Sequence, residues 1–265
     1  MPKFKHEGIE LNYEIEGEGT PFLYLHGLGD NLSFVFETFQ KPQGVKLIAL
    51  DQRGHGRSEH DYKLMSFEKL ADDAMALMNY LSIPTFFVGG LSMGAGVALN
   101  LAIHNTNRVL GLILIRASST DEPMKEDVRN WFDTVSRYLP EDNGKQLFKK
   151  DPIFLSIQEV YPRAVSTFTR YFDDESSVKY PKKFVDMPND TPIRSKEELK
   201  NISIPVLILS NKYDFIHPLE YSLFYKDNMK NVTYFELTSK TVNSSKHVSE
   251  LNTAISNFIA ENKRA

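Results

Sequence analysis

Residues 85–103 read TFFVGGLSMGAGVALNLAI, an apolar run followed by a glycine-rich turn and a run of small residues. Thr85 to Val88 predicts a buried strand, and Ala95 to Ile103 predicts a helix of small side chains. The turn between them, GLSMG at residues 90–94, is so sharp that side chains at its flanking positions would clash, which explains the two glycines. Ser92 is left at the tip of the turn, above the N-terminus of the helix.

Short apolar runs alternate with helical patterns on both sides of this turn. Helical spacing predicts helices over residues 66–81, with Ser66 as N-cap, and over residues 248–259. This alternation predicts a mostly parallel sheet with helices on both faces. The predicted strands are 21–25, 46–50, 85–88, 109–115, 205–209 and 232–237.

The first residues show a different pattern. Apolar and polar residues alternate from Ile9 to Ile15, and Glu16-Gly17-Glu18-Gly19 then leads into the strand at 21–25. Alternation followed by a glycine turn predicts a β-hairpin at the N-terminus.

One long segment interrupts the alternation of strands and helices. From residue 118 to 201 no strand is evident, aromatic residues fit helix faces, and Pro181, Pro188 and Pro192 lead back to the sheet. We therefore predict a core made of residues 1–117 and 202–265, with a helical lid inserted at 118–201.

Composition excludes several classes of protein. The chain has 265 residues, 41% of them hydrophobic, no Cys, and a formal net charge of −4. Without Cys there is no disulfide framework, thiolate zinc site or cysteine nucleophile. No basic cluster suggests nucleic-acid binding, and no apolar run approaches the ~20 residues of a membrane span. We expect a cytoplasmic protein with neither nucleic-acid nor membrane partner.

A serine hydroxyl becomes a nucleophile only when a base removes its proton, and the base needs an acid to hold its tautomer. Asp214 lies just past the strand at 205–209, where the carboxyl ends of parallel strands meet. We predict Asp214 as the acid, with Asp121 as the alternative.

The base must come from the seven histidines. His247 follows the last predicted strand and begins the last helix, from which it can reach Ser92. His217 also fits the order serine, acid, histidine, but Pro218 marks a helix start there and favours a capping or surface role. We predict His247 as the base. No histidine spacing indicates a metal site, and neither a metal nor an organic cofactor is expected.

When the serine attacks a carbonyl group, negative charge develops on the carbonyl oxygen, and preorganised N–H groups stabilise it. Met93, the residue after the serine, is the predicted first donor. The loop His26-Gly27-Leu28-Gly29-Asp30 follows the strand at 21–25, and its Leu28 is the predicted second donor.

Together these motifs resemble α/β-hydrolase-fold proteins of the esterase, lactonase and carbon–carbon hydrolase type. The resemblance is carried by HGLG at 26–29, DQRGHGRS at 51–58, GLSMG at 90–94, Asp214 and His247. It implies a structural role for the 51–58 loop. Ser92 disfavours the related subclasses with an aspartate nucleophile, and Met93 lowers the case for haloperoxidase-like perhydrolases, which usually carry Trp there.

We therefore expect a Ser-His-Asp hydrolase that cleaves a small carboxylic ester or lactone through an acyl-enzyme. A few aromatic residues of the predicted lid are expected to line a pocket for an apolar acyl group. Arg137, Arg163 and Arg170 could bind a carboxylate, but charged helix faces are usually solvated. The alternatives are carbon–carbon bond hydrolysis, acyl transfer or perhydrolysis, and ligand sensing with little turnover. The sequence is also compatible with a homodimer.

Overall fold

The computed structural model describes residues 2–263. Within that range the chain forms an eight-stranded sheet in the order β1-β2-β4-β3-β5-β6-β7-β8. β1 and β2 are antiparallel to their neighbours and the other pairings are parallel, so the predicted mostly parallel sheet is confirmed. The strands are β1 Lys3–His6, β2 Ile9–Glu16, β3 Thr20–Leu25, β4 Val45–Leu50, β5 Phe86–Leu91, β6 Val109–Ile115, β7 Val206–Ser210 and β8 Val232–Glu236.

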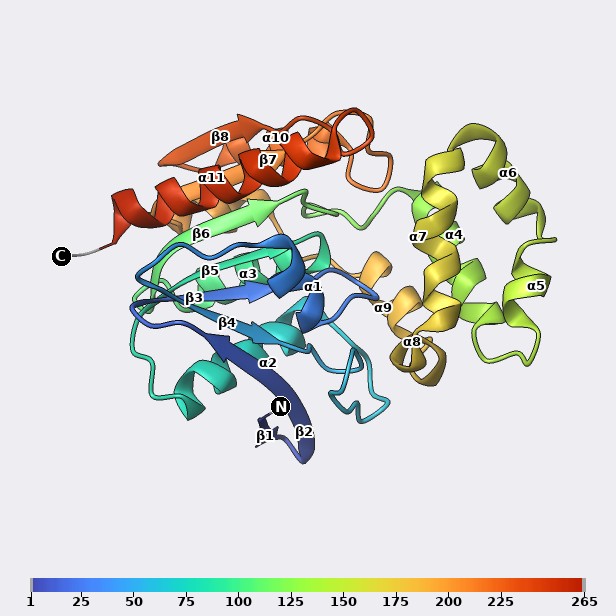
Figure 1. Cartoon of the computed structure of the whole chain (residues 1–265), viewed down its shortest axis with the longest axis horizontal. Helices are drawn as coiled ribbons and strands as arrows, with labels where there is room; N and C mark the ends of the chain where they lie inside the picture. The colour runs from blue at the N-terminus through green and yellow to red at the C-terminus, as the bar shows by residue number, and fades with distance from the viewer. Residues whose placement is uncertain (1, 264–265) are drawn as a thin grey trace.

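Helices cover both faces of the sheet (Figure 1). Successive strand residues point to opposite faces, so one face packs on α2, α3 and α10 and the other on α1 and α11. Ser66 caps α2 as predicted, because its hydroxyl accepts from the Lys69 amide at 3.2 Å. The covering helices are α1 Leu32–Thr38, α2 Phe67–Tyr80, α3 Met93–His104, α10 Leu219–Asn228 and α11 Ser244–Asn262.

The predicted N-terminal hairpin is wrong in its pairing. β2 does not pair with β3 but with β4, antiparallel, and β3 lies on the other side of β4. The hairpin instead joins β1 to β2, and Glu7 at φ 46° and Gly8 at φ 85° turn the chain between them. β3 is a central parallel strand between β4 and β5, and such a strand is covered on both faces. This position suits the apolar side chains of β3.

Between β6 and β7 the chain forms helices, and no strand lies in residues 116–205. We call residues 118–201 the inserted segment. In Figure 1 its helices gather at the end of the sheet toward which the parallel strands point. They are α4 Glu126–Tyr138, α5 Gly144–Phe148, α6 Pro152–Val160, α7 Val165–Thr169, α8 Glu175–Lys179 and α9 Lys183–Asn189, with 3₁₀ turns at Pro162–Ala164, Arg170–Asp173 and Lys196–Asn201.

Side-chain contacts hold the inserted segment against the loops of the sheet. Lys183 is almost fully buried and donates to the Gly54 carbonyl at 2.8 Å. Arg170 pairs with Asp30 at 2.5 Å. No helix among residues 2–263 has the length and apolar character needed to cross a membrane.

Two glycines allow the turn between β5 and α3 to form. A Cβ on Gly90 would lie 2.2 Å from the Gly94 carbonyl carbon, and one on Gly94 would lie 2.2 Å from the Leu25 carbonyl oxygen. Real Cβ atoms do not approach backbone this closely. The N-terminus of α3 therefore reaches the carboxyl end of β3 only because both positions lack a side chain.

This contact yields a stability prediction. Gly94→Ala should lower the free energy of unfolding by about 3 kcal/mol or more, because backbone rather than a mobile side chain must move. Gly44→Ala is the control: its φ is +80°, nothing lies within 4 Å, and the expected cost is about 1–2 kcal/mol. Urea unfolding measures both, and a smaller loss at Gly94 than at Gly44 contradicts the steric argument.

Candidate active site

Ser92 occupies a strained backbone position at the tip of the turn. Its φ and ψ are 57° and −118°, outside the regions that residues with a side chain normally adopt. The Ser92 amide donates to the Ile115 carbonyl at 3.0 Å, which ties the turn to the end of β6. Strain that is held in place by surrounding hydrogen bonds is typical of a functional residue.

The imidazole of His217 lies between Ser92 and Asp214. Its Nε2 is 2.8 Å from the Ser92 hydroxyl oxygen, and its Nδ1 is 3.1 Å from each carboxylate oxygen of Asp214. The Asp214 carboxylate also accepts from the His217 backbone amide at 3.1 Å, so a tight turn folds the ring onto it. Hydroxyl, imidazole and carboxylate thus form a continuous row.

Arg116, which follows β6, pairs with the carboxylate of this row. Its Nη2 is 2.5 Å from Asp214 Oδ2 and 3.1 Å from His217 Nδ1. An ionised carboxylate only accepts hydrogen bonds, so the ring proton belongs on Nδ1, where it faces Asp214. His217 Nε2 then has a lone pair for the Ser92 hydroxyl proton.

Burial, Arg116 and the contact between Asp214 and His217 determine which of these two groups is charged. Burial alone would raise the pKa of Asp214, but the His217 ring and the Arg116 guanidinium hold it well below its usual value. Burial lowers the pKa of His217, and Arg116 lowers it further, although Asp214 acts in the opposite direction. Near neutral pH the row therefore holds a carboxylate and an uncharged imidazole.

The structure corrects the predicted partner of Ser92. His247 lies in the first turn of α11, almost fully buried, and its Nδ1 donates to the Thr238 carbonyl at 2.7 Å. It makes no hydrogen bond to Ser92 in the described chain. The capping expectation for His217 is wrong for its ring, which faces Ser92, although α10 begins after Pro218 as predicted. Both histidines satisfy the chain order, and only the fold distinguishes them.

The two predicted amide donors lie beside Ser92. A Cβ on Gly27 would lie 3.5 Å from the Ser92 Cβ, so the loop that carries Leu28 passes close to the serine. Met93 is the first residue of α3, where an amide has no acceptor inside the helix. Within residues 2–263 no hydrogen bond engages the amide of Leu28 or Met93.

Ser92 and His217 open into a hollow of about 470 Å³ between the sheet loops and the inserted segment. This volume falls in the range of small-molecule sites. Its apolar lining residues include Leu28, Met124, Phe132, Tyr171 and Ile216.

This geometry agrees with sequence comparison. A family model described as alpha/beta hydrolase fold matches residues 20–239, most of the chain. The chain belongs to the alpha/beta hydrolase fold family. The AB hydrolase superfamily protein YisY of Bacillus subtilis (strain 168) is 28% identical over 242 residues, covering 84% of this chain and 85% of YisY.

Solved structures resemble this alpha/beta hydrolase over nearly its whole length. A thermophilic esterase from Thermogutta terrifontis superposes with a TM-score of 0.73 at 22% identity, covering 98% of this chain and 96% of the esterase. An enol-lactonase from Burkholderia xenovorans LB400 gives a TM-score of 0.69 at 21% identity, covering 98% of each chain. At these identities the likeness establishes the fold.

The remaining predicted residues of this hydrolase have different surroundings. The Asp51 carboxylate accepts from the amides of Leu32 and Arg57 at 2.8 and 2.9 Å, consistent with a structural role for the 51–58 loop. Asp121, the alternative acid, does not line the hollow at Ser92. Of the inserted segment's aromatic residues, Phe132 lines that hollow, whereas Trp131 packs edge-on against Phe168.

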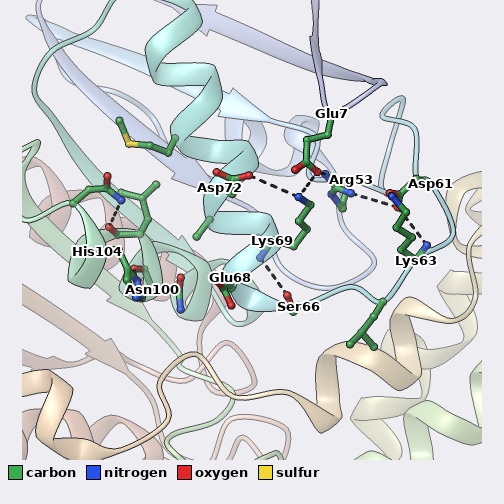
Figure 2. Close-up of a pocket in the computed structure, with 15 residues that line it drawn as sticks. Glu7, Arg53, Asp61, Lys63, Ser66, Glu68, Lys69, Asp72, Asn100 and His104 are labelled. Atoms are coloured by element: carbon green, nitrogen blue, oxygen red, sulfur yellow. Dashed lines mark hydrogen bonds and ion pairs between the residues drawn. The ribbon is translucent and has the colours of Figure 1, made fainter.

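A second, larger hollow of about 820 Å³ lies elsewhere, beside α2 and the β1–β2 turn (Figure 2). Most of its charged groups are paired with one another: Lys69 contacts Glu7 and Asp72, and Arg53 lies 3.5 Å from Asp61. Of the groups able to ligate a metal, His6, Glu7 and Asp72 lie together here, but the Lys69 ammonium stands beside both carboxylates. This hollow has no nucleophile–base pair.

Sequence reasoning missed His217 as the partner of Ser92 and missed Arg116 altogether. The available signal for His217 was its spacing of three residues from Asp214 within one loop. Arg116 directly follows the apolar run of β6, and a charged residue at the carboxyl end of a central strand faces the site edge.

The charge balance predicts a measurable effect on His217. Arg116→Met should raise the pKa of His217, because it removes a cation that opposes imidazolium formation and leaves Asp214 free to pair with the ring. NMR titration of the imidazole C–H signals, assigned with His217→Gln, measures the change. His60, which Arg116 does not influence, is the internal control; an unchanged or lower His217 pKa contradicts the prediction.

Proposed function

We propose that this alpha/beta hydrolase cleaves a small carboxylic ester or lactone through an acyl-enzyme on Ser92. The observation that carries the proposal is the 2.8 Å contact between Ser92 Oγ and His217 Nε2, with Asp214 on the other side of the ring. The esterase and lactonase with the same fold support this reaction class.

Acylation begins with the transfer of the Ser92 hydroxyl proton to His217 Nε2. The serine oxygen attacks the carbonyl carbon, and the resulting oxyanion accepts from the amides of Leu28 and Met93. Two such donors contribute a few kcal/mol each to transition-state stabilisation. The protonated His217 then gives its proton to the departing alkoxide, and Asp214 stabilises the imidazolium during both transfers.

Deacylation uses the same groups in the opposite direction. His217 removes a proton from a water molecule, which attacks the acyl carbon and releases the carboxylic acid and Ser92. The inserted segment lines part of the hollow with apolar side chains, notably Phe132 and Tyr171, that suit an apolar acyl group. His247 has no step in this scheme.

Three variants test the assignment on p-nitrophenyl butyrate, a neutral ester. Ser92→Ala and His217→Gln should each lower kcat by at least about 10⁴-fold, because the nucleophile and its base act as a unit. The control, His247→Gln, keeps a donor for the Thr238 carbonyl and should retain turnover close to wild type. Circular dichroism verifies folding. Turnover that survives Ser92→Ala, or that depends on His247 and not on His217, overturns the proposal.

The lowered pKa of His217 fixes the expected pH profile. The base works uncharged, and an imidazole is uncharged above its pKa, so a pKa below the ordinary 6.5 extends activity toward acid. At pH 6.5 the wild type should retain more than half of its plateau kcat/KM. Arg116→Met should shift this acidic limb to higher pH. A wild-type midpoint above 6.5, measured with the neutral ester, contradicts the prediction.

A further inference from the structure

Lys240 stands at the edge of the hollow that contains Ser92. It belongs to the loop between β8 and α11 and lines that hollow as well as an adjoining one of about 420 Å³. The two hollows also share Arg116, Thr167 and Ile216 in their linings, so they adjoin one another. Lys240 thus lies at the junction between the reacting groups and a second space able to hold the rest of a substrate.

The loop that carries Lys240 is held in place from α11. The Thr238 amide donates to Glu250 at 2.7 Å, and the Thr238 carbonyl accepts from His247 Nδ1 at the same distance. The Lys240 ammonium lies 5.7 Å from the centre of the Phe34 ring. His247 therefore helps to position the loop that carries Lys240. The Lys240 ammonium is thus carried by a loop that is anchored to α11.

The two hollows contain more positive than negative charge. Arg116 pairs with Asp214, and Arg170 pairs with Asp30. Among the described residues, Arg163 donates only to the Thr241 carbonyl, at 3.1 Å. Lys240 has no carboxylate partner anywhere in residues 2–263. Within residues 2–263, the lining therefore contains two cations, Arg163 and Lys240, that have no carboxylate partner.

The geometry points to Lys240 as a specificity residue that binds a negatively charged oxygen group of the substrate, so that the site prefers esters or lactones carrying a carboxylate. This inference rests on the proposed function and narrows its substrate class. Partial loss of hydration, followed by the charge of Arg116, lowers the pKa of Lys240, and a bound carboxylate restores the interactions that the ammonium lacks.

Matched ester pairs test the inference. One pair carries the charge on the acyl side: mono-p-nitrophenyl glutarate and its methyl-capped diester. The other carries it on the leaving group: 4-acetoxybenzoate and its methyl ester. For at least one pair, wild type should prefer the carboxylate by about tenfold or more in kcat/KM, as a charge-assisted hydrogen bond allows.

Variants assign the preference to Lys240. Lys240→Met should abolish it while leaving the capped ester nearly unaffected, and Lys240→Arg should retain most of it. Lys246→Met is the control, because this lysine lies on the same stretch of chain but pairs with Glu250 outside the hollow. A wild type without preference in either pair, a preference that survives Lys240→Met, or an equal loss for both members of a pair overturns the inference.

This experiment separates the two proposals. If Ser92 is not the nucleophile, Ser92→Ala turns over both members of each pair as wild type does. If only the inference about Lys240 fails, Ser92→Ala is inactive while wild type and Lys240→Met show the same ratio between charged and capped esters.

Discussion

The close approach of α3 to β3 is the constraint on which the site depends. The backbone of Gly94 lies so near the Leu25 carbonyl that no side chain fits between them. This contact places the start of α3 beside the loop after β3, with Ser92 between the two. The amides of Leu28 and Met93, which we propose as the oxyanion donors, belong to these two elements and make no hydrogen bond within residues 2–263. A wider turn would move the hydroxyl away from the amides of Leu28 and Met93.

The parallel sheet brings the other groups to this edge. Arg116 follows β6, Asp214 and His217 follow β7, and Lys240 follows β8. Carboxyl ends of parallel strands lie along one edge, so residues far apart in the chain meet without a special connection. The charges are then fixed by contact, since the Arg116–Asp214 pair keeps the carboxylate ionised and opposes protonation of His217.

The carboxylate and the imidazole that line up with Ser92 come from one short loop in this protein. The tight turn from Asp214 to His217 needs only local hydrogen bonds to place the ring on the carboxylate. The loop after β8, which sequence reasoning expected to supply the base, supplies a lysine at the site instead. His247 is turned back toward Thr238, where it fixes that loop. In our proposals, the loop after β7 thus serves proton transfer and the loop after β8 serves substrate recognition.

The sequence by itself determined the parallel strands, the helices α2, α3 and α11, the serine turn and the place of Asp214 just past β7, because each follows from local patterns of apolar residues, glycines and strand ends. It did not reveal β1 or α1, and of α10 it indicated only the start at Pro218. It did not determine that β2 pairs with β4, nor that His217 rather than His247 reaches Ser92. Those outcomes depend on which segments lie side by side, and on a loop conformation that directs one imidazole toward the serine and the other toward a backbone carbonyl. Such directions are set by packing between distant parts of the chain, so only the tertiary structure decided them.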